Sequence, residues 1–232
     1  MGDALSYPLQ NIKSLVVFIV LGIIAAIVGG SSLISLVAGL NSKGLAVGAL
    51  SGLGVIGLLV FILLLFLVEG YALDIIKYGI ERRTDGPGID FGRQISNAIK
   101  LIIVDVVYYL IPLIITFVLG LFLRDWLLLI ISLILFIVFA LANFMAKCRL
   151  AKTEDIGAAL AIGEAIGDIN KVGLVKLIVT AVLIVLIVFI IAMIIGIIAS
   201  MNNTVGSILL GIFAVYFVFL YNRAIGLLYS GV

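Results

Sequence analysis

Four polar side chains stand in stretches that are otherwise apolar: Glu69, Asp105, Asn143 and Arg223. A charge at the centre of a membrane helix costs about 2.5–3.5 kcal/mol on insertion scales, so such groups pair with one another or face water. One interpretation is a structural lock, in which Arg223 pairs with Asp105 or Glu69 and Asn143 bonds between helices. Another is a polar vestibule for an ion, a proton or a lipid headgroup. A third is snorkelling of these side chains to the membrane interface.

Other chemistry has little material in this chain. It contains no histidine and one cysteine, Cys148, so the commonest metal ligand and general base is missing and a cysteine cage cannot form. There is no glycine-rich phosphate loop and no nucleophile with a nearby base. We therefore expect no catalytic residue, no metal site and no cofactor, and we expect that the protein is not an enzyme.

The composition indicates whether this chain folds in water or in a membrane. Its 232 residues are 65% hydrophobic and only 11% charged, with a mean hydropathy of +1.46. Soluble domains are about 25% charged. The net charge of +2 gives no reason to expect a nucleic-acid partner. The sequence therefore predicts a membrane protein.

Six apolar stretches are long enough to cross a hydrocarbon core of about 30 Å. They cover about 14–38, 45–69, 101–123, 126–146, 172–200 and 205–223. We expect an all-α polytopic membrane protein, in which residues 1–232 form a single integral membrane domain of three helical hairpins. Glu69, Asp105, Asn143 and Arg223 then lie toward the same side of the membrane.

Two longer segments, 70–100 and 147–171, join the hairpins and carry most of the charge. If both lie on the side of the termini, every lysine and arginine except Lys43 and Arg124 falls on that side. The positive-inside rule then predicts a multi-pass protein of the cell membrane with both termini cytoplasmic.

These junctions are expected to form amphipathic helices on the cytoplasmic membrane surface. Asp74, Lys77 and Glu81 share one helical face at spacings that allow ion pairs between them. Asp90 is placed to cap a second helix, and Thr153 to cap a helix in the other junction.

Small residues recur at every fourth position in the first two predicted spans, a spacing that lets helix backbones approach closely in lipid. They are Gly22, Ala26 and Gly30 in the first span and Gly44, Gly48 and Gly52 in the second. We expect these helices to pack on each other, with a dimer face as the alternative.

The two junctions also resemble each other in sequence. FGRQISNAIK, which begins at Phe91, aligns without gaps on IGEAIGDINK, which begins at Ile162. The match indicates either repeated helical hairpins, a construction known in transporters, or chance in a biased composition.

Several short motifs together carry a family resemblance. They are Ser6-Tyr7-Pro8, Gly70-Tyr71, Tyr108 with Ile111-Pro112, and Arg149, Ala151 and Thr153 within the 146–166 segment. With them the chain resembles a family of prokaryotic, chiefly archaeal, multi-pass membrane proteins, the domain of unknown function 4013. The resemblance implies a six-helix membrane fold and brings no activity and no catalytic residues.

The expected function is therefore broad. We expect a non-enzymatic protein that organises lipid or partner proteins at the cytoplasmic membrane face through its amphipathic junctions. The alternative is a small transporter or channel subunit with an inner polar vestibule, and a lipid-modifying enzyme comes third. Membrane lipids are the expected partners, with a protein partner or a second copy of the chain as a further possibility.

Overall fold

The computed structural model describes residues 2–41 and 45–232, and of residues 26, 29–31, 33–41, 45–53, 203, 204 and 207 it describes the backbone alone. Over these ranges the regular structure is entirely α-helical, which confirms the predicted all-α class. The helices are α1 (Gly2–Gln10), α2 (Ile12–Asn41), α3 (Leu45–Ile80), α4 (Phe91–Gly120), α5 (Asp125–Thr153), α6 (Ile156–Leu160), α7 (Ile162–Val172), α8 (Leu174–Met201) and α9 (Asn203–Tyr229).

Five helices of the described ranges are long and apolar enough to cross a membrane. They are Gly54–Ile80 within α3, all of α4, α5 and α8, and Ile208–Tyr229 within α9. A sixth candidate is α1 together with Ile12–Ala25 of α2, two pieces that meet at a bend of 80°. The chain is thus a multi-pass integral membrane protein, and the predicted count of six spans depends on that bent pair.

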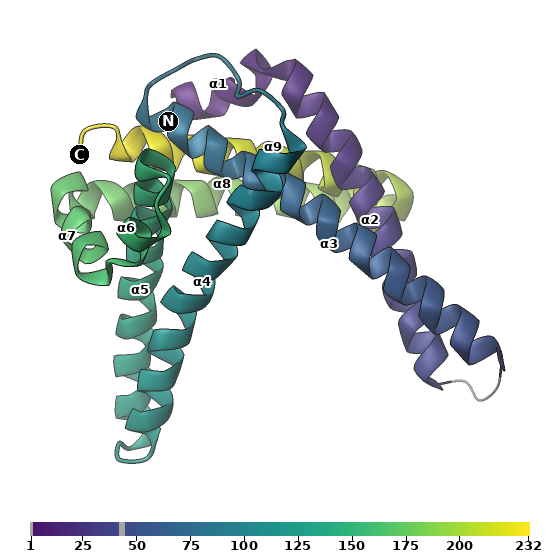
Figure 1. The fold of residues 1–232 in the computed structure, drawn as a ribbon, viewed down its shortest axis with the longest axis horizontal. Helices are drawn as coiled ribbons and strands as arrows, with labels where there is room; N and C mark the ends of the chain where they lie inside the picture. The colour runs from purple at the N-terminus through teal and green to yellow at the C-terminus, as the bar shows by residue number, and fades with distance from the viewer. Residues whose placement is uncertain (1, 42–44) are drawn as a thin grey trace.

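The long helices pack in successive pairs that point away from one another. Helix α2 lies on α3, α4 on α5, and α8 on α9, and Figure 1 shows these three arms diverging from a common end. Helices α1, α6 and α7 and both chain termini gather at that end, which we call the junction end. The predicted arrangement of three hairpins that cross a membrane stays a prediction.

The densest part of the core lies at the junction end. None of residues 55–66 of α3 is buried, whereas every residue from 70 to 76 is. The ring of Tyr71 lies 4.2 Å from that of Phe18 on α2 and 5.4 Å from that of Phe219 on α9, measured between centroids. Burial of these three rings stabilises the place where two of the arms meet.

The outer faces of the arms are apolar, as expected where lipid is the solvent. Large side chains such as Phe117 and Phe122 near the tip of the α4/α5 arm are 70% and 80% exposed. Similar exposed leucines, isoleucines and valines run along α8. In water such a surface would aggregate, so its extent supports the membrane assignment.

Helix packing at glycines differs from the predicted pattern. A Cβ added at Gly22 would lie 2.9 Å from a methyl carbon of Val215, so Gly22 of α2 faces α9 rather than α3. Helices α2 and α3 do pack on each other, and at Gly57 an added Cβ would fall 1.9 Å from the Ser32 hydroxyl. Of the other residues of the predicted pattern, Gly44 lies outside the described residues, and Ala26, Gly30, Gly48 and Gly52 are described by their backbone alone.

Two glycine contacts that the spacing did not indicate bring backbones together. A Cβ on Gly70 of α3 would lie 1.8 Å from the backbone oxygen of Gln94 on α4. A Cβ on Gly226 of α9 would lie 2.4 Å from the backbone oxygen of Ile76, beside Gly79. Helix α3 is therefore held between α4 and α9 at distances that no larger residue permits.

The first junction forms neither of its two expected helices as a separate element, because α3 runs on to Ile80 and α4 begins at Phe91. Asp90 caps α4 as predicted, since its Oδ1 accepts a hydrogen bond of 3.1 Å from the backbone N–H of Arg93. From there α4 runs without interruption to Gly120. The predicted amphipathic helix and the span that follows it are thus a single helix.

The cap in the second junction is two residues later than predicted. Thr153 belongs to the last turn of α5, where its hydroxyl donates to the backbone oxygen of Arg149 at 2.8 Å. Asp155 is the residue that caps the next helix, because its carboxylate accepts from the backbone N–H groups of Gly157 and Ala158. The Asp155 carboxylate can only accept hydrogen bonds, which is what the free N–H groups at the start of a helix require. The Thr153 hydroxyl instead donates its hydrogen to a backbone oxygen of α5.

Candidate functional site

Asp105 on α4 binds two side chains of α5. The Asn143 amide donates to Asp105 Oδ1 at 2.8 Å, and the Lys147 ammonium lies 2.9 Å from the same oxygen. Asn143 and Lys147 are four residues apart, so helical periodicity directs both toward α4. The structure thus brings together two members of the predicted polar cluster and adds Lys147, which the four-residue spacing from Asn143 could have indicated.

Glu69 lies beside this group without joining it. Its carboxylate makes no hydrogen bond or ion pair with any described residue, and its side chain is exposed. It lines a cavity together with Lys147. A carboxylate with no partner at the end of an apolar helix segment is available to bind a ligand.

Arg223 does not meet Asp105 or Glu69, so the pairing expected for the structural lock is wrong. Its side chain is completely buried. The guanidinium donates to the backbone oxygen of Tyr78 at 3.0 Å, lies 3.3 Å from the Asp3 carboxylate, and stacks 4.5 Å from the centre of the Tyr7 ring. Arg223 of α9 therefore binds α1 to the end of α3.

The Asp3 carboxylate should contribute little to this contact. Asp3 is about half exposed and solvent-screened ion pairs contribute about 0–1 kcal/mol, so Asp3→Asn should lower the unfolding free energy by no more than that. Thermal denaturation of the purified protein at low and at high salt measures the effect. A loss well above 1 kcal/mol, or one that salt leaves unchanged, would contradict this estimate.

An apolar-walled wedge separates the arms and ends at Glu69 and Lys147. One part of it, of about 330 Å³, is lined by Glu69, Lys147, Ile184, Val188, Ala214, Phe217, Val218, Tyr221 and Asn222. A second part, of about 560 Å³, is lined by Gly22, Ala25, Phe61, Leu65, Val68, Glu69, Leu210, Gly211, Ala214, Val215 and Val218. Because both parts share Glu69, Ala214 and Val218, we treat them as one wedge.

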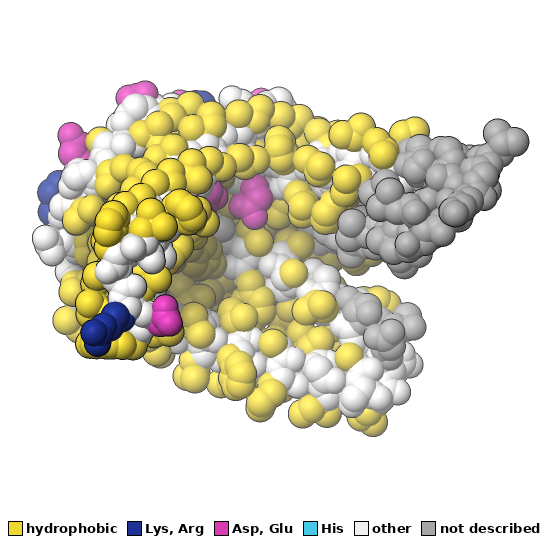
Figure 2. Space-filling model, turned by 90° about the horizontal axis from the view of Figure 1, so that it is seen from below, with side chains coloured by type: hydrophobic (Ala, Val, Ile, Leu, Met, Phe, Trp, Pro, Cys, Tyr) yellow, Lys and Arg dark blue, Asp and Glu magenta, His cyan; other side chains and the backbone are white. Residues whose placement is uncertain are grey.

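The view along the arms makes the wedge visible. Figure 2 shows a hollow between two arms, with hydrophobic side chains on its walls and acidic side chains at its inner end. The walls come from α2 and α3 on one side and from α8 and α9 on the other. Pockets of about 300–1,000 Å³ accommodate small ligands, so the wedge is large enough for one.

The charges of the two junctions pair with each other. Lys77 forms an ion pair with Glu154, and Lys100 donates to the Glu154 backbone oxygen at 3.1 Å. The Lys77 hydrogen bond and charge hold the pKa of the Glu154 carboxyl below its usual value. Asp74 pairs with Arg93 at 3.0 Å, so the predicted pairing of Asp74 and Lys77 within one helix is replaced by contacts between helices.

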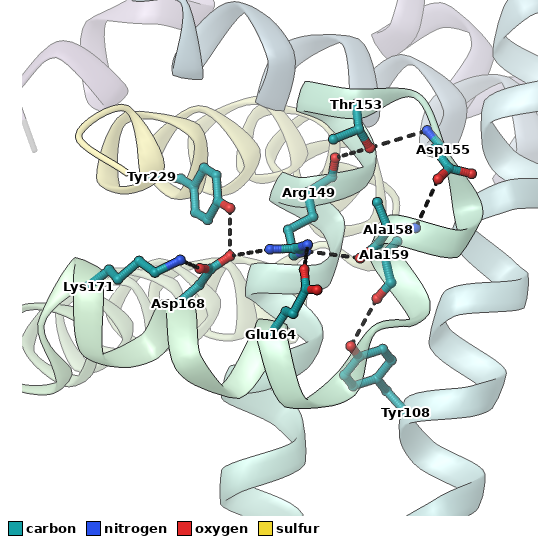
Figure 3. A network of polar contacts seen from close by, with 10 residues as sticks. All are labelled: Tyr108, Arg149, Thr153, Asp155, Ala158, Ala159, Glu164, Asp168, Lys171 and Tyr229. Carbon is teal, nitrogen blue, oxygen red and sulfur yellow. Dashed lines mark hydrogen bonds and ion pairs between the residues drawn. The ribbon is translucent and has the colours of Figure 1, made fainter.

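A second polar network ties the α6–α7 segment to α5 and α9 (Figure 3). At its centre the Arg149 guanidinium donates to the Asp168 carboxylate at 3.0 Å and to the backbone oxygen of Ala158 at 2.9 Å. It also pairs with Glu164. On α9, the Tyr229 hydroxyl donates to Asp168 at 2.7 Å.

Asp168 is fully buried and stays charged within this network. Burial alone would raise its pKa, but hydrogen bonds from Lys171, Tyr229 and Arg149 outweigh that effect and hold the pKa below the ordinary aspartate value. Lys171 contributes at 2.6 Å from the neighbouring turn. Asp168 thus has three donors around it, and the buried centre of the network stabilises the fold.

Metal binding has no support in the part of the chain that is described, where no three Cys, Asp or Glu side chains gather as ligands would.

A family model described as "Protein of unknown function (DUF4013)" matches residues 55–201. No curated protein and no solved structure matches the chain. The matched segment contains Glu69, Asp105, Asn143 and Lys147, and of the Arg149 network it contains all but Tyr229. Arg223 also lies beyond it.

Proposed function

Because the chain belongs to the DUF4013 family of proteins of unknown function, we propose its function from the geometry of the wedge. The protein is a non-enzymatic integral membrane protein that binds a lipid-like amphiphile between its arms. The observation that carries this proposal is a wedge with apolar walls that ends at charged side chains. We assign the junction end to the cytoplasmic side of the cell membrane, because the basic residues gather there.

The chemistry of the walls favours an amphiphile over a polar solute. Ile184, Val188 and Val218 give an acyl chain apolar contacts, and burying each methylene contributes about 0.8 kcal/mol. Glu69 and Lys147 lie at one end only, where a headgroup would be. A molecule with one polar and one apolar end matches this division.

The junctions offer less apolar surface for contact with membrane lipid than expected. Ala165, Ile169 and Val172, the apolar side of α7, are buried in the core against α5 and neighbouring helices. They are therefore not free to lie on a membrane surface. Phe91, Ile99 and Ile102 of α4 remain exposed and can contact lipid.

Filling the wedge should prevent binding. The exposed Ala214 side chain lies where both parts of the wedge meet, so Ala214→Trp should reduce photo-crosslinking of a diazirine-bearing fatty-acyl lipid several-fold. Crosslinked peptides of the full chain in dodecyl maltoside, identified by mass spectrometry, provide the measurement. The matched control is Val182→Trp on the outer face of α8, where labelling should stay at the wild-type level. Equal labelling of both variants would count against the proposal.

A small transporter or channel subunit is the second candidate, and the unpaired Glu69 carboxylate is the observation that favours it. A carboxylate at this depth can bind and release a proton or a cation. Flux of protons and small cations into liposomes containing the protein tests this role. Flux no greater than in empty liposomes would exclude those substrates, whereas flux that Glu69→Gln abolishes would favour transport.

A further inference from the structure

The charges around the wedge do not balance. Glu69 on α3, Asp105 on α4 and Lys147 on α5 are the charged groups at its inner end, two acids and one base. Lys147 is 18% exposed and lies 2.9 Å from Asp105, so that base is already neutralised. The remaining charge is the Glu69 carboxylate, which makes no ion pair with any residue in the described ranges.

Aromatic rings lie next to that charge. Phe217 and Tyr221 on α9 line the same cavity as Glu69, one helical turn apart on one face. The Tyr221 ring is fixed by an edge-to-face contact with Phe144, with centroids 5.8 Å apart. The faces of aromatic rings attract cations, and most strongly where water is excluded.

We propose that the wedge selects an amphiphile with an ammonium headgroup. The ammonium group lies beside Glu69 and the rings of Phe217 and Tyr221, and the alkyl chain follows Ile184 and Val188. An anionic headgroup is disfavoured, because it would bring a third negative charge next to Glu69 and Asp105. This inference rests on the proposed function and adds the chemical class of the ligand.

The strength of the selection follows from the position of the charge. A cation that pairs with Glu69 removes an unpaired charge from apolar surroundings, whereas an anion increases the cost of that charge. We expect a preference of about tenfold or more for the cation, equivalent to about 1.4 kcal/mol. Comparing sulfate and ammonium headgroups on the same alkyl chain measures the effect of the headgroup charge, because the apolar contacts of the chain are then equal.

The experiment is competition against the crosslinking lipid with two probes of one chain length, hexadecyltrimethylammonium and hexadecyl sulfate. The full chain in dodecyl maltoside should release the lipid at about tenfold lower concentrations of the ammonium probe. Glu69→Gln should abolish that difference. Asp125→Asn, which changes the net charge equally at the far tip of the α4/α5 arm, should keep it.

The possible outcomes separate this inference from the function beneath it. If both probes compete equally in the wild type while Ala214→Trp still blocks labelling, the charge selection is overturned and lipid binding stands. Loss of the preference in Asp125→Asn as well would also overturn it, because net charge would then be the cause. If the wild type takes up no crosslinking lipid, the proposed function fails first.

Discussion

Gly70→Ala is expected to destabilise the protein by about 3 kcal/mol, the upper end of the usual cost of overpacking. The added Cβ would lie 1.8 Å from the backbone oxygen of Gln94 and 2.4 Å from its carbonyl carbon. Backbone atoms cannot rotate away as a flexible side chain can, so α3 and α4 would have to separate. Because Tyr71 and its aromatic neighbours pack next to this crossing, the separation would disturb the core at the junction end. Thermal denaturation in dodecyl maltoside measures the loss.

Gly196→Ala is the matched control for this substitution. Gly196 lies within α8 and a Cβ there meets nothing within 4 Å, so the same chemical change has no neighbour to displace. Alanine is the better helix former by about 1 kcal/mol, and the control should be neutral or stabilising. Equal denaturation temperatures for the two variants would refute the assignment of Gly70 as a backbone contact.

The sequence indicates the membrane class and the order of the long helices because those depend on hydropathy and length alone. It also identifies Asp90 as a helix cap, since a cap is a contact over three residues. Long-range pairing is different. Lys77 has acids at pairing distance on its own helix, yet it pairs with Glu154. Nothing in a sequence indicates which of two acids a folded chain will bring nearer.

The polar groups of the spans illustrate the same limit. Asp105 and Asn143 meet because α4 and α5 are neighbours joined by a short turn. Arg223 was expected to meet Asp105 or Glu69, but α9 crosses α3 beside Gly79, and this crossing directs the guanidinium to Tyr78 and Asp3 instead. The position of a crossing depends on backbone contacts that a four-residue glycine pattern does not specify.

The two junction segments that match in sequence are also similar in structure. Two aligned positions are buried in both segments, Gln94 with Ala165 and Ala98 with Ile169, and so are the next residues, Leu101 and Val172. Asp168 is buried as well, whereas its aligned residue Asn97 is half-buried. Both segments are helical, and each packs on a long helix that comes before it in the chain, the first on α3 and the second on α5. Burial at these shared positions favours a repeated unit over chance.

The polar contacts of the two segments are related by an exchange of charge. The third and seventh residues of the first segment, Arg93 and Asn97, bind Asp74 of α3. The third and seventh residues of the second, Glu164 and Asp168, bind Arg149 of α5. Each junction thus uses one charged residue at the end of a long helix to hold the next helix, with opposite sign in the two cases.

Arg149→Met should therefore release the second junction. The substitution keeps the length of the side chain but leaves Asp168 buried with only Lys171 and Tyr229 as partners. Removing one partner of a buried ion pair costs about 3–5 kcal/mol. We expect the unfolding free energy to fall by about 3 kcal/mol, the lower end of that range, because Lys171 remains as a partner of Asp168. The α6–α7 segment should become accessible to limited proteolysis while the long helices stay intact, a pattern that circular dichroism and mass spectrometry can detect.

A double-mutant cycle and a pH series separate this pair from general damage. Asp168→Asn combined with Arg149→Met removes both charges of the buried pair, and the two residues that lose a partner, Lys171 and Glu164, are exposed. The double variant should therefore lose less stability than the sum of the single variants, by about 0.5–3 kcal/mol. Because the folded-state pKa of Asp168 is below its unfolded value, its contribution is present at neutral pH and is lost as the pH falls through the folded pKa. The stability gap between the wild type and Asp168→Asn should therefore narrow below about pH 4. A gap that stays constant into acid would mean that the carboxylate is not the charged centre of the network.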